Sequence, residues 1–169
     1  MNLHELHHKA LAEKEAYAGD EERPLGAFVG LLGLYGTAVG ISTLGVMRSD
    51  RRLPDRFAFA DIALISVATH RLSRLITKDP VTSPLRAPFT RFKGTSAEAE
   101  LEEEVRGTGA RKALGELLTC PFCVGQWVAT GFTFSMVVAP KQTRLAATIF
   151  TAVSAADVLQ YAYAKVQQA

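Results

Sequence analysis

Two cysteines are the side chains of this chain best suited to chemistry. Cys120 and Cys123 stand in the sequence Thr-Cys-Pro-Phe-Cys-Val-Gly, and the chain of 169 residues has no other cysteine. A Cys-x-x-Cys pair can cycle between dithiol and disulfide, and its thiolates can bind a metal ion. Cysteine also packs as a small apolar side chain, so a purely structural role is a third interpretation. The motif by itself leaves the three interpretations open.

A metal site would need ligands besides the two sulfur atoms, because zinc is usually held by four ligands. His70 is the candidate that we expect on the same side of the molecule, and a second copy of the chain could supply others. Three further histidines, His4, His7 and His8, lie in a mixed-charge N-terminal segment, where a solvated helix accounts for them. No cofactor is predicted, and a bound metal ion stays an alternative.

The sequence around the cysteines has the pattern of a helix start. Cys120 fits the N-cap, Pro121 fits the first helical position and Cys123 fits the third. A thiolate there would face the unpaired N–H groups and the positive end of the helix dipole, which lowers a cysteine pKa. The flanking residues lack the strand pattern of a thioredoxin-like domain, so only this local chemistry is shared with redox proteins.

Charged residues are segregated along the chain, and this predicts membrane-spanning helices. No charge occurs from Leu25 to Met47 or from Phe122 to Ala139, and Asp157 is the only one from Leu145 to Ala164. A helix needs about 20 apolar residues to cross a bilayer. A fourth segment has Asp61 at one end and basic residues at the other. We predict an all-α polytopic membrane protein with four transmembrane helices, over residues 24–47, 57–76, 122–139 and 145–164.

The remaining segments are polar. Residues 1–23 form an N-terminal tail, and residues 77–119 form one large polar connection, in which residues 96–107 are predicted to be a short acidic helix. The positive-inside rule favours a bacterial cell membrane with both termini and residues 77–119 in the cytoplasm. Glycines spaced four apart in residues 24–47 favour close helix packing, within the chain, in a homo-oligomer or against another membrane protein.

Four spans would bring the end of residues 57–76 and the start of residues 122–139 to one membrane face. We therefore expect a polar cluster there. Either a basic residue of this cluster offsets the charge of Asp157, or Asp157 is uncharged or reaches a wet interface. Trp127 fits an interfacial aromatic belt or a contact between helices. The candidate residues of this cluster are His70, Arg71, Arg74, Asp79, Arg86, Glu116, Trp127 and Asp157.

Two blocks of the sequence resemble a known family. The arginine block ends at Phe89 and reads His-Arg-Leu-Ser-Arg-Leu-Ile-Thr-Lys-Asp-Pro-Val-Thr-Ser-Pro-Leu-Arg-Ala-Pro-Phe. The cysteine block ends at Trp127 and reads Gly-Glu-Leu-Leu-Thr-Cys-Pro-Phe-Cys-Val-Gly-Gln-Trp. Both are similar to blocks of the bacterial membrane family called domain of unknown function 1360. The resemblance covers about residues 57–164 and implies a small integral membrane protein without an assigned reaction. It also implies that the arginine block and the cysteine block form one site, with residues 1–23 and 24–47 as additions.

The sequence contains no phosphate-binding loop, no nucleophile–base pair and no basic patch for nucleic acid. We therefore expect a non-enzymatic membrane component that acts in the lipid bilayer through helix packing or partner binding. The alternative is a membrane thiol–disulfide protein that uses Cys120 and Cys123, or a shared metal site.

Overall fold

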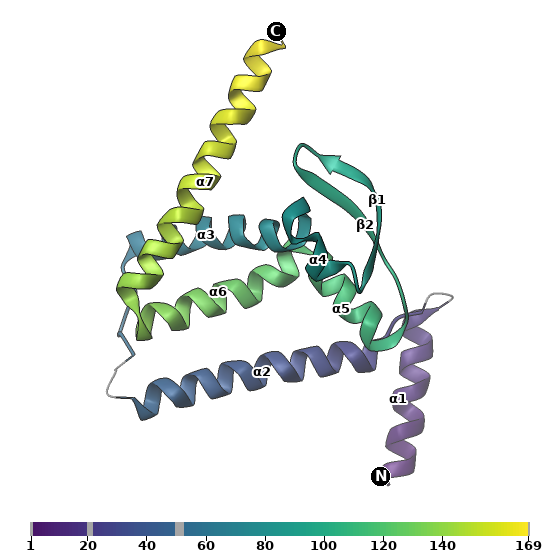
Figure 1. Cartoon of the computed structure of the whole chain (residues 1–169). Helices are drawn as coiled ribbons and strands as arrows, with labels where there is room; N and C mark the ends of the chain where they lie inside the picture. The colour runs from purple at the N-terminus through teal and green to yellow at the C-terminus, as the bar shows by residue number, and fades with distance from the viewer. Residues whose placement is uncertain (1, 20–21, 50–52, 169) are drawn as a thin grey trace.

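The computed structural model describes residues 2–19, 22–49 and 53–168. Most of these residues are helical, and a smaller β-hairpin lies to one side of the long helices (Figure 1). In chain order the elements are α1 (Leu3–Ala18), α2 (Leu25–Arg48), α3 (Phe59–Lys78), the 3-10 turn η1 (Pro80–Thr82), α4 (Ser83–Arg86), β1 (Thr90–Ala97), β2 (Glu100–Val105), α5 (Gly109–Thr119), α6 (Pro121–Val138) and α7 (Pro140–Gln167).

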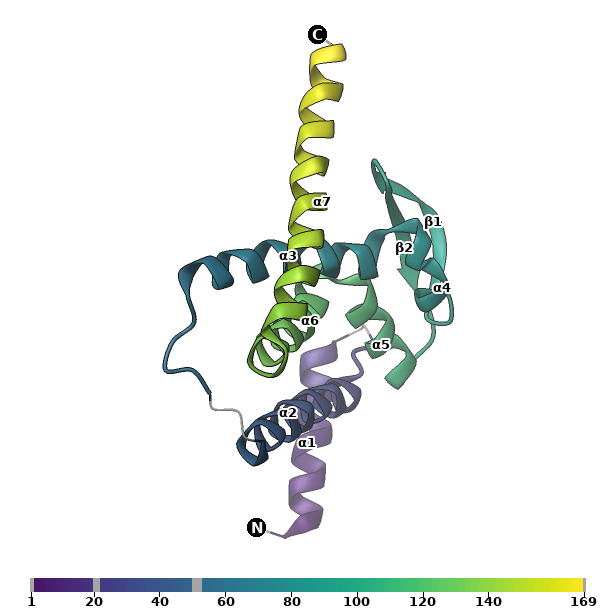
Figure 2. The ribbon, with the colours of Figure 1, turned by 60° about the vertical axis from the view of Figure 1, so that its left-hand side comes forward.

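Helices α3, α6 and α7 form the core. Helices α3 and α6 lie side by side, whereas α7 crosses α3 steeply and its C-terminal half projects beyond the other helices (Figures 1 and 2). Ala68 and Ala147 are fully buried in this core, and their small side chains allow α3 and α7 to approach closely. The ring of Phe132 meets the ring of Phe150 edge-on, with 6.4 Å between centroids, and fills the space between α6 and α7.

Three of the four predicted spans correspond to helices that are long and apolar enough to cross a membrane. Among the described residues these are α2, α6 and α7, and their bounds differ from the predicted ones by one to five residues. Helix α3 matches the fourth predicted span in position and has 20 residues, but it does not belong to this group. Asp61, Arg71 and Arg74 lower its hydropathy, so four spans are not established by helix length and composition.

The helix start at the cysteines has the predicted form. Cys120 is the N-cap of α6, its Sγ accepts a hydrogen bond of 3.2 Å from the backbone N–H of Cys123, and Pro121 occupies the first turn. Proline costs nothing there, because the first N–H groups of a helix have no partner within the helix. Only Cys120 separates α6 from α5, so the two helices are joined by a short, well-defined corner.

The prediction of an all-α chain is wrong for the polar connection. Strands β1 and β2 pair antiparallel, from Thr90 opposite Val105 to Ala97 opposite Glu100. Strand β2 lies within residues 96–107, which were predicted to be a short acidic helix. Leu101, Glu103 and Val105 are half-buried, and the glutamates between them are exposed. This alternation has the period of a strand, and tertiary contacts of the half-buried residues outweigh the helix propensity of glutamate and leucine.

Helix α2 packs on α5 and α6 at the edge of the core, and α1 projects away from the rest of the molecule (Figure 1). The apolar side chains of α2 are mostly exposed, including Val29, Leu32 and Ile41 at 66–70% exposure. None of the glycines of α2 has a neighbour within 4 Å of where a Cβ would lie. The predicted close packing of this glycine-rich helix is therefore absent within the described part of the chain.

Candidate functional site: a charged notch between α3, α7 and the hairpin

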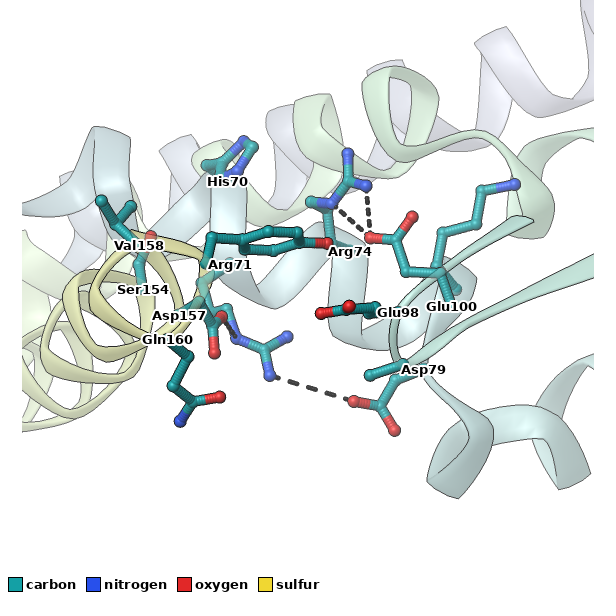
Figure 3. Close-up of a pocket in the computed structure, with 13 residues that line it drawn as sticks. His70, Arg71, Arg74, Asp79, Glu98, Glu100, Ser154, Asp157, Val158 and Gln160 are labelled. Carbon is teal, nitrogen blue, oxygen red and sulfur yellow. Dashed lines mark hydrogen bonds and ion pairs between the residues drawn. The ribbon is translucent and has the colours of Figure 1, made fainter. Parts of the chain in front are cut away.

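A pocket of about 340 Å³ opens between the C-terminal half of α3, the middle of α7 and the tip of the β-hairpin (Figure 3). Residues of α3 spaced three or four apart share one helix face and form one wall, and residues of α7 with the same spacing form another. We call this pocket the charged notch. Its lining residues are His70, Arg71, Arg74, Lys78, Asp79, Glu98, Ala99, Glu100, Ser154, Asp157, Val158, Gln160 and Tyr161.

Arg71 lies between two carboxylates in the notch. Its Nε is 3.1 Å from Oδ2 of Asp157 on α7, and its Nη2 is 3.9 Å from Oδ2 of Asp79 at the end of α3 (Figure 3). The Nε atom is buried, but it is not aligned for a hydrogen bond with Asp157. One guanidinium thus offsets two carboxylates, and Asp157 keeps unused acceptor capacity. The expected basic partner of Asp157 is therefore Arg71.

Arg74 connects α3 to the hairpin. Its Nε donates to Oε1 of Glu100 at 2.8 Å, and its Nη2 also contacts this oxygen. Glu98 lies in the hairpin turn and lines the notch together with Glu100. Within the described residues, neither Glu98 nor Lys78 forms an ion pair, so two opposite charges in the notch lack a direct partner there.

Arg86 lies outside the notch, where it connects several segments from a fully buried position. Its Nη1 donates to the backbone oxygen of Ile76 at 2.8 Å and to Oγ1 of Thr82 at 2.7 Å, and its Nη2 donates to the oxygen of Asp79 at 3.1 Å. Its Nε pairs with the carboxylate of Glu103, which is 6% exposed. Arg86 therefore joins the end of α3 to β2 as a structural residue.

Glu116 and Trp127 lie at the contact with α2. The Oε1 of Glu116 is 3.3 Å from Nη1 of Arg23, and the ring of Trp127 meets the ring of Tyr35 edge-on at 5.1 Å. The hydroxyl of Tyr35 also accepts a hydrogen bond of 2.7 Å from Nε2 of Gln126. These residues dock α2 onto the core, and they do not line the notch.

Cys120 and Cys123 are joined by a disulfide, with 5.3 Å between their Cα atoms, and neither lines the notch. The disulfide thus lies outside the notch, whereas Gly115 and Gly125 of the cysteine block lie against Phe89 and Ser73 of the arginine block. His70 is exposed and lines the notch. Across residues 2–19, 22–49 and 53–168, no group of three or more His, Cys, Asp and Glu side chains is placed to hold a metal ion.

A second ion pair joins α3 to α7 at the other end of their contact. Arg144 Nε donates to Oδ1 of Asp61 at 2.8 Å, and Arg144 Nη2 donates to Oδ2 at 2.7 Å. Such a bidentate pair fixes the orientation of both side chains. Together with the pair between Arg71 and Asp157, it places a charge contact at each end of the apolar surface shared by the two helices.

The outer face of the hairpin is solvated and carries its own charge pair. Nζ of Lys93 lies 2.8 Å from Oε2 of Glu104, and both side chains are at least half exposed. The hydrogen bond from Lys93, its positive charge and the more distant charge of Arg91 hold the pKa of the Glu104 carboxyl below its ordinary value. Lys93 therefore stabilises the ionised form of Glu104 although both side chains are exposed.

These features define a mostly helical protein in which a β-hairpin, fastened by arginines, closes one side of a charged notch. Residues 64–163 match the family described as Protein of unknown function (DUF1360), and the chain belongs to this family. The Sporulation protein YjcA of Bacillus subtilis (strain 168) is 37% identical over 83 residues, which are 47% of this chain and 70% of that protein. No solved structure matches the chain. The family match runs from α3 to α7, and it includes every residue that lines the notch.

Proposed function

We propose that the chain is a non-enzymatic integral membrane protein that acts by packing against another membrane protein or a second copy of itself. The observation that carries this proposal is the exposure of apolar side chains on the long helices. On α7, Leu145, Val158 and Leu159 are 65–71% exposed, and α2 has a similar surface. In water such surfaces would favour aggregation, whereas lipid is as apolar as they are.

Helix α3 is proposed as a fourth span whose charges are paired or lie near its ends. At 20 residues it is about 30 Å long, which matches the hydrocarbon thickness of a bilayer. Asp61 lies in its first turn and pairs with Arg144, whereas Arg71 pairs with Asp157. Paired charges and basic side chains that reach toward headgroups are the forms in which charge is tolerated in spans. Four spans would place both termini and residues 77–119 on one side, which we assign to the cytoplasm.

Extraction and labelling test this placement. We expect the protein to remain in bacterial membranes after washing with alkaline carbonate and to require detergent for a monodisperse solution. In a chain with Cys120→Ser and Cys123→Ser, single cysteines at Asp55 and Lys93 should react with an impermeant maleimide from opposite sides, because α3 separates them. A cysteine at Lys14 serves as the control and should behave like Lys93. Release by carbonate would contradict the membrane placement, and equal labelling of Asp55 and Lys93 would contradict the span α3.

A second candidate function is thiol–disulfide exchange at the start of α6. It is favoured by the pairing of Cys120 with Cys123 and by the exposure of Cys123, which a dithiol of another protein can reach. In such an exchange the partner dithiol becomes a disulfide and the pair is reduced to two thiols. A thiolate at Cys123 would face the N-terminal end of α6, which stabilises negative charge.

Alkylation with a mass tag tests this second candidate in intact cells. A redox role predicts that the tagged fraction rises after treatment with dithiothreitol and falls after treatment with diamide, and that it recovers after the reagents are removed. The single variant Cys120→Ser provides the reference for one tag. A pair that stays fully oxidised or fully reduced under all three conditions contradicts redox cycling and favours a structural role.

A further inference from the structure

The two sulfur atoms of the disulfide between Cys120 and Cys123 are not equivalent. Cys123 lies in the first turn of α6 and is exposed, whereas Cys120 is half-buried at the corner between α5 and α6. Phe122, between them, is 91% exposed, so the described part of the chain does not cover this turn. A thiolate that opens a disulfide attacks one sulfur while the other leaves, and the exposure of Cys123 favours attack there.

A hydrogen bond at the helix start distinguishes the two sulfur atoms further. Sγ of Cys120 accepts a hydrogen bond of 3.2 Å from the backbone N–H of Cys123 and thereby caps α6. This bond becomes stronger when Cys120 is a thiolate, because a charged acceptor binds a donor more strongly than a neutral one does. The positive end of the helix dipole acts in the same direction. Negative charge that develops on Cys120 is therefore stabilised.

The N–H donor stays in place when the bond between the sulfur atoms breaks. The backbone N–H of Cys120 donates to the oxygen of Leu117 at 3.3 Å, and the oxygen of Cys120 accepts from the N–H of Val124 at 3.0 Å. These backbone bonds hold Cys120 at the corner independently of its side chain. The donor to Sγ is the backbone of Cys123, so it is kept whichever sulfur the Cys123 side chain is bonded to.

We propose that a partner dithiol attacks Sγ of Cys123 and that Cys120 is the leaving group, an inference that rests on the thiol–disulfide exchange proposed above. The partner's thiolate forms a bond with Sγ of Cys123, the bond between the two cysteines breaks, and its electron pair stays on Cys120. The partner's second thiolate then attacks the partner's own sulfur in this mixed disulfide and releases Cys123. Two electrons pass from the partner to the pair, and the two protons that the partner loses balance those that Cys120 and Cys123 take up.

Mapping of the first adduct on the purified full chain tests this assignment. The oxidised chain is mixed with glutathione in detergent, the reaction is stopped at early times with acidic N-ethylmaleimide, and peptide mass spectrometry locates both groups. Extrapolated to zero time, glutathione on Cys123 with maleimide on Cys120 should exceed the reverse arrangement about tenfold, because the leaving thiolate keeps a charge-assisted hydrogen bond. Equal or reversed adducts overturn the proposal, and so does a disulfide that glutathione does not open.

The same mapping with 2-mercaptoethanol separates the leaving group from access to the sulfur atoms. This thiol is much smaller than glutathione, so exposure limits its attack less, whereas the hydrogen bond to the leaving sulfur does not depend on the attacking thiol. The preference for Cys123 should therefore persist. A preference that occurs with glutathione alone would mean that exposure decides, and it would overturn the role of Cys120 as the favoured leaving group.

Phe122→Ala is the matched control, because it removes the exposed side chain between the cysteines and keeps the backbone N–H of Cys123. The adduct ratio should be unchanged, and equal adducts in this variant would overturn the proposal, since Phe122 and not the helix start would then direct the attack. The mapping uses purified protein, so it does not depend on redox cycling in cells. A pair that never cycles in cells would refute the second candidate function and leave the assignment of the two sulfur atoms standing.

Discussion

Replacing Arg86 with methionine is expected to lower the free energy of unfolding by about 3–5 kcal/mol. Methionine fills a similar volume, but it leaves the carboxylate of Glu103 buried without a counter-charge. The backbone oxygens of Ile76 and Asp79 lose a donor as well. The unfolding midpoint in detergent, followed by near-UV circular dichroism, should fall by about 10 °C for a chain of this length.

The matched control is Arg91→Met, which makes the same substitution at an exposed position of β1. Its effect is expected to be within about 0.5 kcal/mol. The double variant Arg86→Met with Glu103→Leu should recover part of the loss, because it removes both members of the buried pair. Equal midpoints for Arg86→Met and Arg91→Met would contradict the structural role of Arg86.

Replacing Gly115 with alanine is expected to destabilise the protein by about 1–3 kcal/mol. A Cβ at this position would lie 2.6 Å from Cγ1 of Val105 and 3.1 Å from the backbone oxygen of Phe89. Helix α5 passes directly under the hairpin there, and the backbone carbonyl of Phe89 cannot move without disturbing its hydrogen bond with Arg106. The same thermal unfolding experiment measures the effect.

Gly131→Ala is the control for helix propensity, because Gly131 lies in α6 with no atom within 4 Å of its added Cβ. This variant should be neutral or slightly stabilising, since alanine favours helices more than glycine does. If both glycine variants unfolded at the same temperature, the close contact between α5 and the hairpin would not limit the residue at position 115.

The long helices could be predicted from the sequence because their signals are local. Long apolar runs, broken only by Asp157 in α7, fix α2, α6 and α7 to within five residues, and the pattern Cys-Pro-x-Cys fixes the start of α6. Such signals need only neighbours along the chain, as capping and hydropathy do. The family resemblance, confirmed by the match to residues 64–163, added the importance of the arginine block but no geometry.

The hairpin could not be predicted by the same means, because its stability comes from distant partners. Glu103 is held by Arg86, Glu100 is held by Arg74, and Val105 packs against Gly115. A glutamate-rich segment read alone favours a helix. The sequence of β2, Glu-Leu-Glu-Glu-Glu-Val, also lacks the apolar–polar alternation of a strand, because the half-buried position between Leu101 and Val105 is a glutamate.

The candidate site was predicted in part. His70, Arg71, Arg74, Asp79 and Asp157 do line one notch, since the face of α3 and the crossing of α7 bring them together. Glu98 and Glu100 were missed because their segment was assigned to a helix. Tyr35 was missed because its partners on α6 are more than 90 residues away, and no pattern within α2 marks it.

The two ion pairs between α3 and α7 have a consequence for the surrounding bilayer. Asp61 and Arg71 are ten residues apart, or about 15 Å, and their partners Arg144 and Asp157 are thirteen apart, or about 20 Å. Both intervals, measured along the helix axes, are shorter than the roughly 30 Å of hydrocarbon that these helices are proposed to cross, so at least one ion pair would lie inside the hydrocarbon layer. The bilayer would become locally thinner beside these two helices to relieve this hydrophobic mismatch, or a neighbouring protein would cover the helices and make the thinning unnecessary.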